Sequence, residues 1–159
     1  MGREAVTLNT KEILLELRTR NGFSQEQLAE KVHVSRQAVS RWETGETIPN
    51  TETLKLLSRL FGVSINTLLG APRRLICQCC GMPLEDPVIS REPDGAFNEE
   101  YCTWCYADGK FVYTSLGQLL DFLADSMSSA QWPPEQVRAH FEARLAGLNH
   151  WKRSAAGTP

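Results

Sequence analysis

The feature that most constrains the fold of this chain is a pair of Cys-x-x-Cys motifs in its second half. One motif holds Cys77 and Cys80, the other holds Cys102 and Cys105, and 21 residues separate them. Zn²⁺ binds four thiolates tetrahedrally at about 2.3 Å, and one such turn presents two sulfurs to the same metal. Gly81, directly after Cys80, permits the positive φ that turns backbone N–H groups toward the sulfurs. The spacing therefore predicts that these four cysteines hold one zinc ion.

Three interpretations of the cysteine segment are open, and its spacing favours the first. A closed four-thiolate site is structural, because no position is left for a catalytic water. The second interpretation is a thiol-disulfide or redox-sensing switch, with or without zinc. The third, a thioredoxin-like active site, needs a Cys-x-x-Cys motif that opens a helix after a strand, and no such pattern is seen. Cys79, the fifth cysteine, is left off the metal and interpreted as a free thiol that could be redox-reactive.

Composition narrows the class of protein. The apolar fraction of 42% and the charged fraction of 23% are those of a globular protein. No apolar run approaches the roughly 18 residues that a membrane span needs, and residues 1–6 lack the apolar core of a secretory signal. We therefore expect a cytoplasmic protein, in which disulfides seldom persist and clustered cysteines favour metal binding or redox chemistry.

The net charge of −2 conceals a difference between the two halves. Residues 1–74 hold eleven Lys and Arg against eight Asp and Glu, a net charge of +3. Residues 75–159 have a net charge of −5. A polyanion is attracted by the first half and repelled by the second. The excess of +3 supports nucleic-acid binding without proving it.

Capping residues and apolar periodicity predict a mainly helical chain. Thr10, Ser24, Ser35 and Ser64 are the expected N-caps in the first half. The helices expected there are 10–21, 25–32, 36–43, 51–61 and 65–69. The second half is expected to contain two short strands and two helices, at 87–91, 110–113, 115–127 and 134–151.

The segment from 25 to 43 has the pattern of a helix-turn-helix. Two short helices surround the turn His33-Val34-Ser35, and Ala29 is the small residue that lets the helices approach each other. The face expected to be buried consists of Leu28, Val32, Val34, Val39 and Trp42.

The residues left exposed on the second of these helices point to DNA. They share one face near its N-terminus, where a major-groove helix meets base edges; they are Arg36, Gln37, Ser40 and Arg41. Arg suits guanine O6 and N7, and Gln suits adenine N6 and N7. Gln25 and Ser35, at the two helix N-termini, are expected to contact phosphate oxygens.

The stretch QEQLAEKVHVSRQAVSRWETG, residues 25–45, resembles the λ-repressor-like (Cro/CI, XRE) family. The resemblance covers residues 7–70. It implies a five-helix domain that binds double-stranded DNA as a homodimer on a two-fold symmetric operator. It also implies a phosphate contact for Gln25, base reading by the four residues named above, and a buried salt bridge between Arg18 and Glu43. His33 departs from the frequent Gly of the turn, so we expect a slightly strained φ > 0 there.

The second half resembles a zinc-ribbon domain that occurs alone or attached to bacterial regulators. Its pattern opens with CxxCGMPL, found at residues 77–84, and continues with YCxxCYxDGxF, found at 101–111. Two helices ending in Trp-Lys follow, matched by Trp151 and Lys152. The resemblance covers residues 76–152 and implies a fold more than an activity.

Together these patterns predict a helix-turn-helix domain at 7–70, a linker at 71–76, a zinc ribbon with two helices at 77–152 and a disordered tail at 153–159. The expected function is a sequence-specific transcriptional regulator whose second half mediates dimerisation, partner binding or signal sensing. The alternative is a zinc- or redox-responsive switch in which the cysteines control DNA binding. No nucleophile–base pair, phosphate loop or open metal site indicates an enzyme. His140 and His150 are too far apart to share a metal and are interpreted as surface or packing residues.

Overall fold

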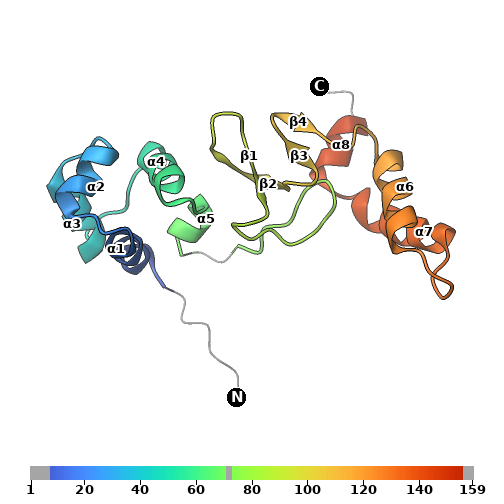
Figure 1. Ribbon diagram of the computed structural model, residues 1–159, viewed down its shortest axis with the longest axis horizontal. Coiled ribbons are helices and arrows are strands. Elements are labelled where there is room, and N and C mark those ends of the chain that lie inside the picture. Colours follow the sequence, from blue (N-terminus) through green and yellow to red (C-terminus); the bar gives the residue numbers. More distant parts are fainter. Residues whose placement is uncertain (1–7, 71–72, 156–159) are drawn as a thin grey trace, which may run out of the picture. The chain divides into compact units, whose positions relative to one another are not determined.

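The computed structural model describes residues 8–70 and 73–155, and the chain divides into two compact units at Arg73–Arg74, apart from the stretch Gly95–Phe97. The first unit contains five helices (Figure 1): α1 (Thr10–Arg20), α2 (Gln25–Lys31), α3 (Arg36–Thr44), α4 (Thr51–Phe61) and α5 (Ile65–Leu68). The second contains four strands and three helices: β1 (Ile89–Arg91), β2 (Phe97–Cys102), β3 (Tyr106–Ala107), β4 (Lys110–Phe111), α6 (Leu116–Met127), α7 (Pro134–Leu145) and α8 (Asn149–Ala155). The mainly helical fold class is confirmed.

The helices of the first unit begin at polar caps whose side chains accept a backbone N–H. Ser24, Ser35 and Ser64 act as the sequence predicts. The expectation for Thr10 is wrong by one residue: Asn9 is the N-cap of α1 and forms a capping box with Glu12. The box satisfies two backbone N–H groups at once, which Thr10 as the cap would not do.

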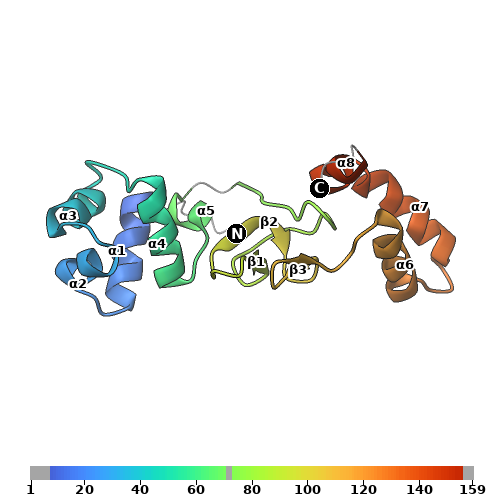
Figure 2. The same cartoon turned by 90° about the horizontal axis from the view of Figure 1, so that it is seen from above.

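The core of the first unit draws on α1 to α5. Its buried members are Leu14, Leu28, Ala29, Val32, Val39, Trp42, Leu54, Leu57 and Leu68. Leu28, Leu57 and Leu68 have no exposed surface. Figure 2 shows α1 and α4 side by side, with α2 and α3 together at one end of this unit.

The turn between α2 and α3 is closed by a local hydrogen bond. The Val34 N–H donates to the Ala29 carbonyl at 2.9 Å, and Ala29 is 3% exposed. His33 has φ 57°, which confirms the expected left-handed residue in this turn. The strain is tolerable because His accepts this conformation more readily than β-branched residues do.

The second unit contains two small sheets. β1 pairs with β2, and β3 pairs with β4 in antiparallel register, with Tyr106 opposite Phe111. Asp108 and Gly109 join β3 to β4 with φ of 51° and 76°, the pattern of a two-residue type I′ turn. The sequence prediction placed strands at 87–91 and 110–113 and missed β2 and β3. β2 has the sequence FNEEYC, and the three consecutive polar residues at 98–100 break the apolar alternation expected of a strand.

The prediction of one helix over 134–151 is wrong. α7 ends at Leu145 and α8 begins at Asn149. Gly147 lies between them, and it favours the break because a Gly inside a helix costs about 1 kcal/mol relative to Ala. The break lets Trp151 turn inward, where its indole Nε1–H donates to the Cys79 carbonyl at 2.8 Å. α8 then continues to Ala155, three residues into the expected tail, and residues 156–159 lie outside the described residues.

α6 and α7 lie side by side in both views (Figures 1 and 2). Arg138 of α7 forms an ion pair with Asp121 of α6, and Leu119, Leu120 and Val137 are buried. Within residues 8–70 and 73–155, no helix combines the length and apolar character needed to cross a membrane.

Candidate DNA-binding surface and metal centre

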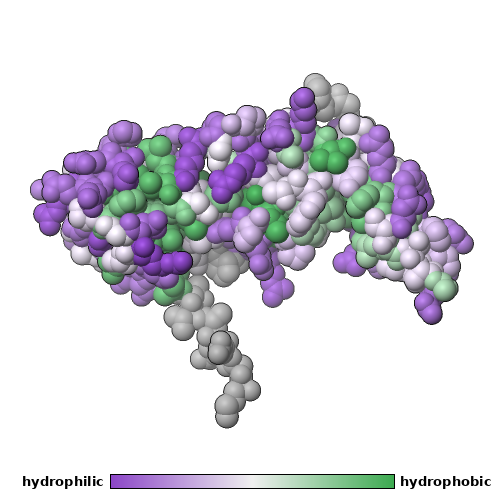
Figure 3. All heavy atoms as spheres, in the orientation of Figure 1, coloured by the Kyte–Doolittle hydropathy of each residue, from purple (hydrophilic) through white to green (hydrophobic). Residues whose placement is uncertain are grey.

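The candidate base-reading residues lie on α3. Arg36, Gln37 and Arg41 are exposed, and Ser40 is half-buried. Val39 and Trp42 point the opposite way and are only 1% and 6% exposed. Because this face of α3 is fixed in the core, the polar face is presented to solvent as a rigid unit. Hydrophilic side chains cover the region of α2 and α3 (Figure 3).

The arginine side chains on this face form no strong ion pair within the described residues. Arg41 Nε lies 3.9 Å from Glu46 Oε2, and both side chains are more than 60% exposed. Such a pair contributes about 0–1 kcal/mol and exchanges easily. Within the part of the chain that the structure describes, Arg36 has no ion-pair partner.

A network centred on Glu43 ties α1, α2 and α3 together. Arg18 donates from Nε to Glu43 Oε1 at 2.5 Å and from Nη2 to Oε2 at 3.0 Å. Arg18 Nη1 also donates to the Phe23 carbonyl. The hydrogen bonds to Glu43 raise the pKa of Arg18. The salt bridge that the family resemblance implies is therefore present, with side chains 13% and 6% exposed.

The network includes a contact that the sequence analysis did not predict. Gln25 Nε2 donates to Glu43 Oε2 at 2.8 Å, so the candidate phosphate-binding amide is half-buried and oriented by α3. Ser35, the other candidate anchor, uses Oγ to accept the Ala38 N–H at 3.2 Å. No sequence signal reveals the Gln25 contact, because its partner lies 18 residues away.

The four predicted metal ligands come together in the second unit. The sulfurs of Cys77, Cys80, Cys102 and Cys105 all lie within 4.8 Å of one another. Cys80 Sγ and Cys102 Sγ are 3.7 Å apart. A tetrahedron with Zn–S distances of about 2.3 Å has sulfurs about 3.8 Å apart. The arrangement therefore fits a tetrahedral thiolate-binding metal such as Zn²⁺.

Backbone geometry shapes the sulfur cluster. The Cys77 N–H donates to the Met82 carbonyl and the Gly81 N–H to the Cys77 carbonyl, both at 2.8 Å. Gly81 has φ 74°, as expected for the residue after the second cysteine of the motif. The Cys102 N–H points at Cys77 Sγ from 3.4 Å, so backbone dipoles favour negative charge on that sulfur.

The thiols are too close to ionise independently. Hydrogen bonds from Cys102 and Cys105 lower the pKa of Cys77, and a hydrogen bond from Cys105 lowers the pKa of Cys102 to about 7. Hydrogen bonds to Cys102 are the main cause of the raised pKa of Cys80 and of Cys105. The four thiols therefore titrate as a coupled set, and a divalent cation would let all four ionise together.

The remaining cysteine and histidines lie outside the cluster of ligand atoms. Cys79 has no exposed surface, so the redox-reactive alternative for its thiol lacks solvent access. His150 packs against Phe111 with tilted rings, whose centroids are 4.5 Å apart. His140 contacts Trp132 edge-on at 5.6 Å. Both histidines make packing contacts, in line with the sequence interpretation.

Family comparisons divide the chain in the same way. Residues 14–68 match a family model described as helix-turn-helix. Residues 76–152 match a family model described as a zinc ribbon domain.

Individual relatives match the first unit. BcrR, a transcriptional activator of Enterococcus faecalis, is 52% identical over 58 residues, which are 36% of this chain and 28% of BcrR. ImmR, a transcriptional regulator of Bacillus subtilis, is 39% identical over 57 residues, covering 36% of this chain and 45% of ImmR. The crystal structure of the P22 c2 repressor with a synthetic operator is 35% identical and covers 39% of this chain and 94% of that chain, with a TM-score of 0.38.

This chain spans less than half the length of either curated relative. Both relatives are named as transcriptional regulators and neither as an enzyme, in keeping with the sequence interpretation. The chain joins an N-terminal helix-turn-helix domain of the XRE/Cro-CI type to a C-terminal zinc-ribbon domain.

Proposed function

We propose that the chain is a transcriptional regulator that recognises a specific double-stranded DNA sequence through α3. The observation that carries this proposal is the division of α3 into two faces. Val39 and Trp42 fix one face in the core, while Arg36, Gln37 and Arg41 stand exposed on the other. A helix held in this way enters the major groove as a rigid reader. The regulators BcrR and ImmR match the same unit.

Each proposed reader has a chemical role. Arg36 and Arg41 suit the O6 and N7 acceptors of guanine, and Gln37 suits N6 and N7 of adenine. Ser40 can donate to or accept from either kind of base. Binding DNA requires Arg41 to leave Glu46, and this exposed 3.9 Å pair offers little resistance.

The proposed phosphate anchors keep a donor available. The Gln25 amide uses one N–H on Glu43, so its second N–H remains for a phosphate oxygen. The Ser35 Oγ accepts the Ala38 N–H, so its own O–H remains as a donor. In this view Glu43 orients the Gln25 amide before DNA arrives.

We propose that two copies bind together on a two-fold symmetric operator. A helix-turn-helix dimer contacts half-sites about one DNA turn apart, roughly 34 Å. Affinity would fall steeply with salt, since phosphate neutralisation releases counterions. The second unit, including its helices, is the proposed site of dimerisation or of a protein partner.

The proposed role of zinc is structural. Cys77, Cys80, Cys102 and Cys105 would hold the ion, whose charge neutralises their thiolates and fixes the ribbon. Four protein ligands leave no open position, so no reaction is assigned to the metal.

Selection of bound DNA from a random pool tests the DNA-binding proposal. The full chain, loaded with zinc, should enrich one sequence with two-fold symmetry and half-sites about one turn apart. Arg36→Ala should lose this enrichment, while Arg20→Ala, an exposed change on α1, should retain it. If the zinc-loaded chain enriches no sequence, the proposal is overturned.

A second candidate is a zinc- or redox-responsive switch, and the exposure of Cys80 favours it. Cys80 is half-buried whereas the other three ligands are buried, so an oxidant or chelator reaches this sulfur first. The discriminating measurement is affinity for the selected operator with and without chelator or mild oxidant. Unchanged affinity in a folded protein would make the zinc purely architectural.

A further inference from the structure

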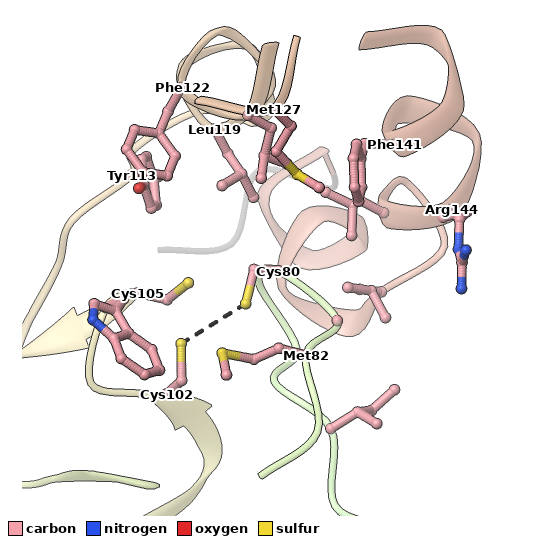
Figure 4. A pocket seen from close by; sticks show the side chains of 16 residues that line it. Cys80, Met82, Cys102, Cys105, Tyr113, Leu119, Phe122, Met127, Phe141 and Arg144 are labelled. Carbon is pink, nitrogen blue, oxygen red and sulfur yellow. Dashed lines mark hydrogen bonds between the residues drawn. The ribbon is translucent and has the colours of Figure 1, made fainter. Parts of the chain in front are cut away.

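A pocket of about 560 Å³ lies in the second unit between the ribbon and the helices α6 and α7. Figure 4 shows Tyr113, Leu119 and Phe122 on one side of it and Cys80 and Cys102 on another. Its volume lies within the roughly 300–1,000 Å³ of small-molecule sites. Three of the proposed zinc ligands form part of its lining, but most of the lining consists of apolar side chains that a structural metal site does not require.

The pocket is lined mainly by large apolar side chains, and some of them are exposed to solvent. Trp104 is 58% exposed, Phe122 52% and Met127 44%. Hydrophobic side chains also reach the surface of this unit in Figure 3. Covering such surface is favourable, so an apolar ligand would gain most of its affinity here.

Arg144 is the one cationic side chain among the described residues that line the pocket, and no Asp or Glu is present. The lining also includes Cys80, Cys102 and Cys105, whose thiolates would be bound to zinc. Arg144 lies at the edge of the pocket in Figure 4. Its Nη1 is 3.4 Å from His140 Nε2, and within the described part of the chain it makes no ion pair with an acidic side chain. Its guanidinium is therefore available to an anion.

We propose that this pocket binds a small molecule with an apolar body and one carboxylate or similar anionic group. The apolar body would lie against Trp104, Phe122 and Met127, and the anion would accept hydrogen bonds from Arg144. Arg and carboxylate form charge-assisted, frequently bidentate hydrogen bonds. The site adds a ligand to the second unit and does not depend on the DNA-binding proposal.

Calorimetric titration of the full chain, loaded with zinc, tests the site. The probes are decanoate below its micelle concentration and 1-naphthoate, with the uncharged alcohols 1-decanol and 1-naphthalenemethanol for comparison. At least one carboxylate should bind with one-to-one stoichiometry, and its alcohol should bind roughly tenfold or more weakly, because a charge-assisted hydrogen bond is lost. Absence of binding by both carboxylates would overturn the proposal.

Substitutions distinguish the contact between the anion and Arg144 from nonspecific hydrophobic binding. Arg144→Gln should reduce carboxylate affinity roughly tenfold and remove the preference over the alcohol, and Arg144→Lys should restore part of it. Arg153→Gln is the matched control, because Arg153 is exposed on α8 and does not line the pocket. Equal carboxylate binding by the wild-type chain and Arg144→Gln would overturn the assignment.

The oligomeric state provides an independent check. Phe122 is exposed, so Phe122→Asp should fold, and its added negative charge should repel the carboxylate. Sedimentation should give the same mass for Phe122→Asp and wild type. The ligand site would be overturned if the wild type binds neither carboxylate and Phe122→Asp converts a dimer into a monomer. These two results together would assign this face to contact with a second copy of the chain.

Discussion

The two units of the chain differ in what holds them together. The first has a continuous apolar core in which Leu14, Leu28 and Leu57 are almost or completely buried. Between Cys77 and Cys105, the buried apolar residues other than cysteine are Leu84, Ile89 and Tyr101. From this difference we infer that the first unit folds on side-chain burial, whereas the ribbon draws on a metal ion bound by its thiols.

The largest effect is expected from removing a metal ligand. Cys105→Ser should lower zinc affinity and destabilise the ribbon by a large part of the roughly 10 kcal/mol that a whole structural zinc site supplies, because metal binding supplies folding free energy. Metal content per chain and calorimetric melting would measure this. The first unit should keep its own transition. Cys79→Ala, which removes a buried thiol outside the metal cluster, should keep one zinc per chain. A Cys105→Ser protein that retains zinc and its ribbon transition would contradict the comparison.

The converse change targets the core of the first unit. Leu57→Ala should destabilise that unit by about 2–5 kcal/mol, since Leu57 has no exposed surface and a cavity would remain. Denaturant unfolding followed by α-helical circular dichroism measures the change. Leu15→Ala, at a side chain that is 42% exposed, should change stability by no more than about 0.5 kcal/mol. Loss of zinc caused by Leu57→Ala would show that the units do not fold independently.

A smaller effect is expected at the Arg18–Glu43 pair. Arg18→Ala leaves a carboxylate that is 6% exposed without its cation, and should cost about 2–3 kcal/mol. Lys55→Ala breaks an exposed pair with Glu52 and should cost about 0–1 kcal/mol. Comparing the two unfolding curves gives both values. If the two variants lose equal free energies of unfolding, burial of the Arg18–Glu43 pair adds nothing to its effect on stability.

The sequence predicts those features that local chemistry determines. Ser24 and Ser35 mark helix starts because their side chains satisfy the first backbone N–H groups. His33 takes the positive φ that the turn requires. The cysteine spacing predicts the ligand set, because each Cys-x-x-Cys turn brings its own two sulfurs together.

The features that the sequence does not predict depend on distant partners. The strand β2 forms although residues 98–100 in it are polar, since it pairs with β1. The bond between Gln25 and Glu43 joins two helices. The pocket beside Cys80 arises only when α6 and α7 meet the ribbon. No local pattern of residues encodes these contacts, because tertiary packing creates them.

We propose that the polar face of α3 reads DNA bases. The most direct test measures the affinity of the wild-type chain and of Gln37→Ala for the selected operator and for operators changed at one base pair each. If α3 reads bases, Gln37→Ala should cost about 1–3 kcal/mol of binding free energy on the selected operator and remove discrimination at one position in each half-site. A variant with unchanged affinity and unchanged discrimination at every position would contradict it.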